Sequence, residues 1–182
     1  MFRTNRWLAH CVRSFAAIAL ISTTLCANPR TAVARGDVDP KTGMKFPERI
    51  SSFGREGGIE YDAAGYPEAT YLLGHIALAS VFYYKEAPFP KEYANARDAV
   101  KIKTPSARLI SEGPSNLHSG GRRALFSFQG PFLGRPNVKL FSELLMFPHR
   151  DFYLTFRITY AASQADRTRQ EIDALVRGFR MP

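Results

Sequence analysis

The chain has 182 residues, a formal net charge of +9 and 45% hydrophobic residues. A chain of this length indicates one domain, and it can bury enough surface to form a core without metal ions or disulfides. Its 14 phenylalanines and 8 tyrosines exclude a disordered protein, because their burial offsets the entropy lost on folding.

The first 34 residues have the pattern of a secretory signal peptide. Three arginines precede an apolar run at residues 15–25, and the small residues Ala32-Val33-Ala34 follow. A basic start, an apolar stretch and an A-x-A site are what signal peptidase reads. We therefore expect cleavage after Ala34, or alternatively after Ala27, and a product that is periplasmic or secreted.

The apolar run is too short for a transmembrane anchor. A helix that crosses a bilayer needs about 20 apolar residues, whereas residues 14–27 offer only 14 before Pro29 breaks the pattern. We therefore expect no transmembrane segment after cleavage.

Cleavage would remove residues that matter for the chemistry and the charge of the chain. It removes both cysteines, Cys11 and Cys26, and four arginines, so 21 basic residues against 16 acidic residues leave a net charge of +5. The mature chain then has no thiol for catalysis, for zinc or for a disulfide. So modest a charge does not indicate a nucleic-acid partner, and we expect none.

The start of the mature chain predicts a leader followed by strands. Residues 35–45 are polar and contain glycine and proline, so we expect a flexible leader before a single domain at residues 46–182. Three strands are expected at residues 50–61, 69–74 and 75–85. The third has the clearest pattern, because apolar or aromatic residues recur between Ile76 and Tyr84 on one face.

A helix is predicted after the third strand. Apolar residues recur there at helical spacing, with charged residues between them. These apolar residues are Phe89, Tyr93, Ala96 and Val100. Pro105 should end or kink the helix, and residues 106–112 are predicted to form a short second helical piece. A polar loop is expected at residues 115–121.

The rest of the chain predicts three more strands and a closing helix. The strands are expected at residues 123–132, 137–147 and 151–161. The middle strand is apolar on both faces, which indicates a central strand covered on both sides. Ser163 is predicted to cap the closing helix, with Asp166 three residues on. The apolar stripe of this helix is Ile172, Leu175, Val176 and Phe179.

These elements predict an α+β fold, with an antiparallel sheet of about six strands in the order βββαβββα packed against two main helices. The opening Phe46-Pro47-Glu48-Arg49-Ile50, and the Phe156-Arg157-Ile158-Thr159-Tyr160 segment before an amphipathic helix, resemble uncharacterised small secreted or periplasmic proteins of Gram-negative bacteria. The architecture also resembles the PsbP-like fold, a sheet flanked by helices in accessory and lipoprotein domains. This resemblance implies no catalytic residue.

The histidines and serines do not form a motif. His75, His118 and His149 lie in different predicted elements without metal-ligand spacing, so we predict no metal and no cofactor. The neighbouring His149 and Asp151 could join Ser115 or Ser119 in a hydrolytic triad, but the chain lacks a G-x-S-x-G turn. A tight turn at His149 is the preferred interpretation.

The most suggestive loop is Ser119-Gly120-Gly121-Arg122-Arg123. Glycines let backbone N–H groups approach an anion, and two arginines can hold phosphate, sulfate or carboxylate. The alternative is a flexible hairpin with solvated arginines. Glu143 and Arg157 lie in apolar strands, where they could form an ion pair or line a cleft. The candidate ligand-binding residues are His118, Ser119, Arg122, Arg123, Glu143 and Arg157.

Three hypotheses about function follow from these patterns. We expect an exported, non-catalytic accessory or binding domain of the periplasm or envelope, whose partner is a protein or another envelope component. The alternative is a protein that binds small anionic ligands, or an enzyme, with a cleft near residues 120–123. A third reading is weak adhesion to anionic lipid head groups, which added salt would weaken.

Overall fold

The computed structural model describes residues 37–85 and 87–182. The expected signal peptide, both expected cleavage sites and both cysteines lie outside these residues.

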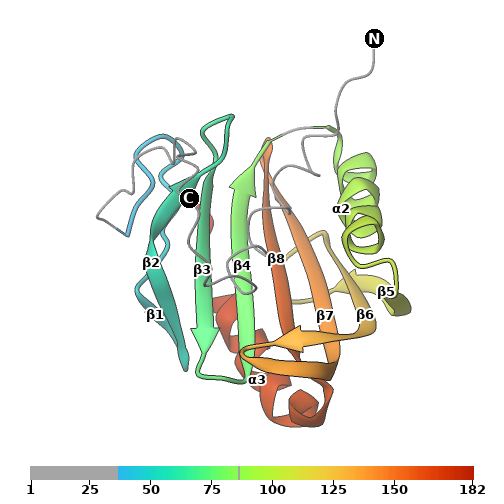
Figure 1. Ribbon diagram of the computed structural model, residues 1–182. Coiled ribbons are helices and arrows are strands. Elements are labelled where there is room, and N and C mark those ends of the chain that lie inside the picture. The colour runs from blue at the N-terminus through green and yellow to red at the C-terminus, as the bar shows by residue number, and fades with distance from the viewer. Residues whose placement is uncertain (1–36, 86) are drawn as a thin grey trace.

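In the described part of the chain, eight strands form one antiparallel sheet in the order β1-β2-β3-β4-β8-β7-β6-β5 (Figure 1). The strands are β1 (Arg49–Ile50), β2 (Phe53–Tyr61), β3 (Pro67–Leu73), β4 (Ala77–Tyr84), β5 (Arg108–Ser115), β6 (Gly121–Phe132), β7 (Arg135–His149) and β8 (Phe152–Ala161). Each half of the chain forms a run of hairpins, and the halves join where β4 pairs with β8. The helix α2 (Phe89–Lys103) connects the halves.

The expected six-strand βββαβββα arrangement is wrong, because the sheet has eight strands. One additional strand is the two-residue β1, which a tight turn at Ser51 separates from β2. The other is β5, in which residues 108–112 belong to the segment predicted to be helical. The sheet accommodates Pro114 because β5 is an edge strand. On the solvent side of an edge strand, a missing backbone N–H removes no hydrogen bond to a neighbouring strand. Pairing with β6 along almost the whole of β5 overrides the weak helical pattern.

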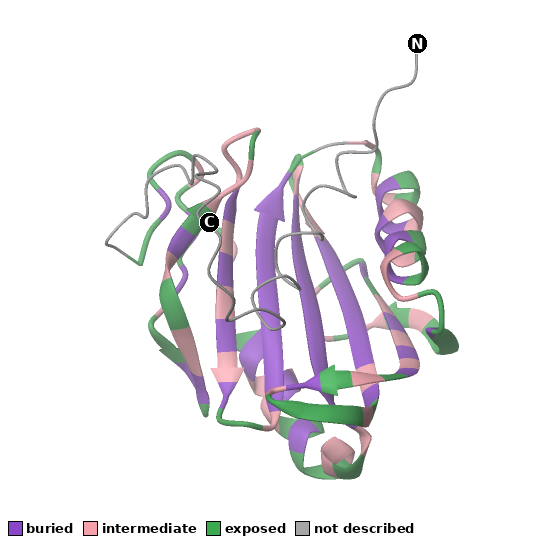
Figure 2. Ribbon diagram, in the orientation of Figure 1, coloured by how far each residue is buried: buried purple, intermediate pink, exposed green. Residues whose placement is uncertain are grey.

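The sheet has a hydrophobic core on each face. Alternate residues of the strands face α3 (Ala165–Gly178), where Ile172, Leu175 and Val176 are buried. The opposite set faces α2, where Tyr93, Ala96 and Val100 are buried. The predicted apolar stripes of both helices are therefore buried, except at Phe89, which is half-buried. Figure 2 shows that β4 and β8 are buried over most of their length, whereas β7 is buried mainly in its second half.

The start of α3 differs from the prediction. Ser163 lies within a short 3-10 turn, η1 (Ala162–Gln164), and the N-cap position belongs to Gln164, without a side-chain capping bond. The hydroxyl of Thr168 instead donates to the carbonyl oxygen of Gln164 at 2.7 Å. The predicted cap at Ser163 is therefore wrong, because the 3-10 turn shifts the first α-helical residue to Ala165.

Candidate functional site

The loop between β5 and β6 carries His118 and Ser119. The Nε2 atom of His118 lies 2.9 Å from the carbonyl oxygen of Val176 in α3, and its ring meets Phe147 edge-on with centroids 5.0 Å apart. Because a carbonyl oxygen only accepts hydrogen bonds, Nε2 donates in this contact. Ser119 is exposed at the tip of the loop. His118 therefore ties the hairpin to the C-terminal end of α3.

Structural requirements explain why glycine occurs at positions 120 and 121, at the end of the loop and the start of β6. Gly120 has a φ of +69°, a left-handed conformation that favours glycine. Gly121 is buried, and a Cβ atom there would collide with the ring of Phe147. Backbone conformation and packing account for both residues.

Arg122 and Arg123 point to opposite faces of the sheet, because successive residues of a strand alternate. On the α2 face, the Arg122 guanidinium lies 3.1 Å from the carboxylate of Glu112 and 4.8 Å above the ring of Tyr93. Glu112 also contacts Arg97 of α2 at 3.5 Å. The two neighbouring arginines thus lie on different surfaces, each beside its own carboxylate.

Arg123 belongs to a buried polar cluster on the α3 face. Its guanidinium lies 2.5 Å from Oε2 of Glu143, and the hydroxyl of Tyr160 donates to Oε1 of Glu143 at 2.6 Å. Glu143 is 0% exposed, whereas the Arg123 side chain is 31% exposed. Burial and the charge of Glu143 raise the pKa of Tyr160, so this phenol stays neutral and can donate. The cluster joins β6, β7 and β8.

The structure does not pair Glu143 with Arg157. The register places Glu143 opposite Ile158, and Arg157 opposite Leu144 and Ser80. Arg157 therefore lies on the α2 face and Glu143 on the α3 face. Arg157 is 5% exposed, and its strand neighbours on that face include buried hydroxyl residues. These are Ser80, Ser142, Thr155 and Thr159.

The other candidate groups are separated as well. His149 Nε2 lies 2.6 Å from the carbonyl oxygen of Pro182, and Asp151 pairs with Lys85 at 2.8 Å. Among residues 37–85 and 87–182, no three His, Cys, Asp or Glu side chains gather where they could hold a metal ion. The same residues contain no helix long and apolar enough to cross a membrane.

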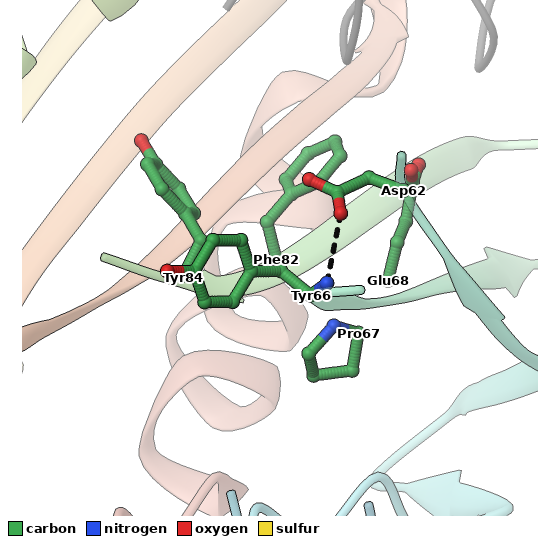
Figure 3. Close-up of a pocket in the computed structure, with 6 residues that line it drawn as sticks. All are labelled: Asp62, Tyr66, Pro67, Glu68, Phe82 and Tyr84. Carbon is green, nitrogen blue, oxygen red and sulfur yellow. Dashed lines mark hydrogen bonds between the residues drawn. The ribbon is translucent and has the colours of Figure 1, made fainter. Parts of the chain in front are cut away.

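A small hollow opens between β3 and β4 (Figure 3). Its lining consists of Asp62, Tyr66, Pro67, Glu68, Phe82 and Tyr84. The carboxylate of Asp62 accepts hydrogen bonds from the backbone N–H groups of Ala64 and Tyr66, both at 2.8 Å. The volume in which the centre of a water molecule fits is about 10 Å³. This is room for about one water. It is too small to enclose an organic substrate.

The most exposed apolar surface lies where α2 ends and β5 begins. Ile102 is 58% exposed, Leu109 38% and Ile110 56%, and Lys101 and Arg108 beside them are exposed. Only a tight turn, in which Ala107 N–H donates to the carbonyl oxygen of Thr104 at 2.8 Å, separates the end of α2 from the start of β5 along the chain. We call Lys101, Ile102, Arg108, Leu109 and Ile110 the basic–aliphatic corner.

Sequence reasoning missed this corner. Ile102 lies off the buried stripe of α2, and Leu109 and Ile110 are adjacent, so a strand cannot bury both on one face. The register shift between Leu109 and Ser111 leaves Ile110 in a bulge. The adjacent aliphatic residues Leu109 and Ile110 could therefore have indicated an exposed apolar surface. The prediction of a helix at residues 106–112 prevented that interpretation.

Free energy of unfolding is expected to fall in alkaline solution, partly because of Tyr93. Burial first, and then the charge of Glu112, raise the pKa of Tyr93 to about 12. The unfolded chain loses this proton near pH 10, so the contribution is complete below about pH 10 and is lost progressively as the pH rises to about 12. From about pH 9 to 11 the loss is about 1 kcal/mol. Urea denaturation of Tyr93→Phe should show a shallower decline than the unmodified protein; an equal decline would contradict this assignment.

Comparison with known proteins yields a weak likeness of fold. No family model matches the chain, and no curated protein matches it. The solution structure of cyanobacterial PsbP (CyanoP) from Synechocystis sp. PCC 6803 is 13% identical, with a TM-score of 0.45 over 74% of this chain and 95% of that chain. A mutant of the protein Mog1 is 13% identical, with a TM-score of 0.43 over 63% of this chain and 79% of that chain. This weak likeness to CyanoP is the one that corresponds to the expected PsbP-like fold, and it says nothing about activity or partners.

Proposed function

We propose that this protein is an exported, non-catalytic accessory domain that binds a component of the bacterial periplasm or envelope. The observation that carries the proposal is the basic–aliphatic corner. Four large apolar residues are exposed among those the structure describes, and three of them lie in the corner. Single exposed aliphatic residues are ordinary, but clustered ones mark a surface that another molecule covers.

The carboxylates of the strands support a binding role of the protein more than a catalytic role. Glu143 is held by Arg123 and Tyr160, and Glu112 by Arg97 and Arg122. A general base or a nucleophile must reach a substrate, whereas these carboxylates join elements of the fold. The corner, by contrast, presents its side chains outward.

A sedimentation experiment tests the proposal. The product of the full-length gene is purified and mixed with membranes from the producing bacterium, and the bound fraction is measured after centrifugation. We expect saturable binding, and a loss of about tenfold or more in affinity when Ile102 and Ile110 are both replaced by serine. Val38→Ser is the matched control, because Val38 is 45% exposed and lies outside the corner.

Two results would overturn this proposal. One is equal binding of the double variant and the unmodified protein. The other is recovery of the gene product in the cytoplasm with residue 1 still present, since the proposal requires export and cleavage.

A further inference from the structure

We infer that the basic–aliphatic corner binds the surface of an anionic lipid bilayer. This inference rests on the proposed function and names the envelope component. Both faces of the sheet carry hydrophobic cores, so a partner that binds the sheet must approach an edge.

The two edges of the sheet differ. At one edge, β1 has two residues, and Glu171 of α3 accepts hydrogen bonds there from the Ser51 hydroxyl at 2.9 Å and the Ser52 N–H at 3.2 Å. At the other edge, β5 has eight residues and is exposed along most of its length. The corner lies at the start of this open edge, beside the last turn of α2 (Figure 1).

Addition of a partner strand to β5 is disfavoured. The bulge at Ile110 interrupts the ladder near one end of β5, and Pro114 lacks a backbone N–H near the other. Bulges and prolines are devices that keep edge strands from pairing. Binding at the corner must therefore use side chains.

The chemistry of these side chains fits lipid better than protein. Stable protein interfaces bury about 800 Å² on each partner, and their centres are enriched in aromatic residues and depleted in lysine. The corner offers three aliphatic side chains, one lysine, one arginine and no aromatic ring. Peripheral membrane binding needs this combination, in which aliphatic groups enter the acyl boundary and basic groups meet anionic head groups.

Nearby acidic groups do not cancel the positive charge of the corner. Glu112 contacts both Arg97 and Arg122, and Asp98 pairs with Arg97 at 3.0 Å. Lys101 also lies in the last turn of α2, where a cation stabilises the helix dipole. Ile102 beside it has no such structural reason to be exposed. An anionic surface therefore meets Lys101 and Arg108 together with the aliphatic residues.

The test uses vesicles of equimolar phosphatidylcholine and phosphatidylglycerol, with pure phosphatidylcholine vesicles for comparison. We expect reversible binding to the anionic vesicles alone, weakened more than tenfold between about 0.1 and 1 M salt, where the Debye length falls from about 10 to 3 Å. Lys101→Gln with Arg108→Gln should weaken binding about 25-fold, because each basic residue near such a surface contributes about fivefold. Ile102→Ser with Ile110→Ser should weaken binding about tenfold or more.

Lys91→Gln is the matched control for charge, since Lys91 is exposed at the opposite end of the same helix. Val38→Ser is the control for apolar exposure. Thermal unfolding of every variant verifies that the fold is retained, which is expected because all substituted residues are exposed.

The outcomes separate the lipid inference from the proposed function. No binding to anionic vesicles, with corner-dependent binding to bacterial membranes, would overturn the lipid inference and retain the proposed function with a protein or glycan partner. Vesicle binding that the corner variants leave unchanged would overturn the assignment of the corner. Equal binding to both vesicle types would overturn the role of Lys101 and Arg108.

Discussion

Replacing Arg123 with methionine is expected to lower the free energy of unfolding by about 2–3 kcal/mol. The substitution leaves the carboxylate of Glu143 fully buried without its cation. Losing one partner of a buried ion pair costs about 3–5 kcal/mol, and the 31% exposure of the Arg123 side chain reduces this value through solvent screening. Urea denaturation at neutral pH measures the change as a lower midpoint at unchanged slope.

The neighbouring residue supplies a matched control. Arg122→Met removes an arginine from the same strand, but the Glu112 side chain is 20% exposed and keeps Arg97. We expect a loss of about 1 kcal/mol, from a surface ion pair and a cation–π contact. Equal losses for Arg122→Met and Arg123→Met would contradict the buried-pair account. Arg123→Met combined with Glu143→Leu should recover part of the loss, because an apolar replacement leaves no buried charge.

Gly121→Ala is expected to destabilise the protein by about 2 kcal/mol, or about 4–8 °C in Tm. The added methyl group meets the ring of Phe147, which is 0% exposed and lies in the core beneath α3. The ring can yield only by disturbing its contacts with His118 and Phe156. Differential scanning calorimetry measures the change.

Gly113→Ala is the control for Gly121→Ala. Gly113 also lies in a strand of the same hairpin, but nothing stands within 4 Å of the position its Cβ would occupy. Alanine there should change stability by less than about 1 kcal/mol, because it mainly reduces the entropy of the unfolded chain. A Tm for Gly121→Ala as high as that for Gly113→Ala would refute the packing role of Gly121.

Periodicity of the sequence located most elements. The alternation at residues 76–84 and 152–160 corresponds to β4 and β8, and the stripe from Ile172 to Phe179 corresponds to the buried side of α3. The prediction failed at β5, because its residues alternate poorly and follow Pro105. An edge strand owes its structure to the strand beside it, here β6, and local sequence does not encode that pairing.

The candidate site was less predictable than the fold. A prediction can note that Glu143 is acidic within an apolar strand, but its partner depends on register, and a shift of one residue moves a side chain to the other face. For this reason the sequence suggests Arg157 as the partner of Glu143, whereas the structure pairs Glu143 with Arg123. The bond from His118 to Val176 spans 58 residues, and the exposure of Ile102 depends on where α2 meets the sheet. Such relations arise from tertiary packing.

Hydrogen–deuterium exchange of the protein bound to bacterial membranes tests the central claim most directly, because it locates the bound surface without substitutions. The account predicts slower exchange on binding in peptides covering residues 101–110 and unchanged exchange in peptides covering residues 118–123. Protection confined to residues 118–123, or the same exchange everywhere in the free and bound protein, would contradict the account.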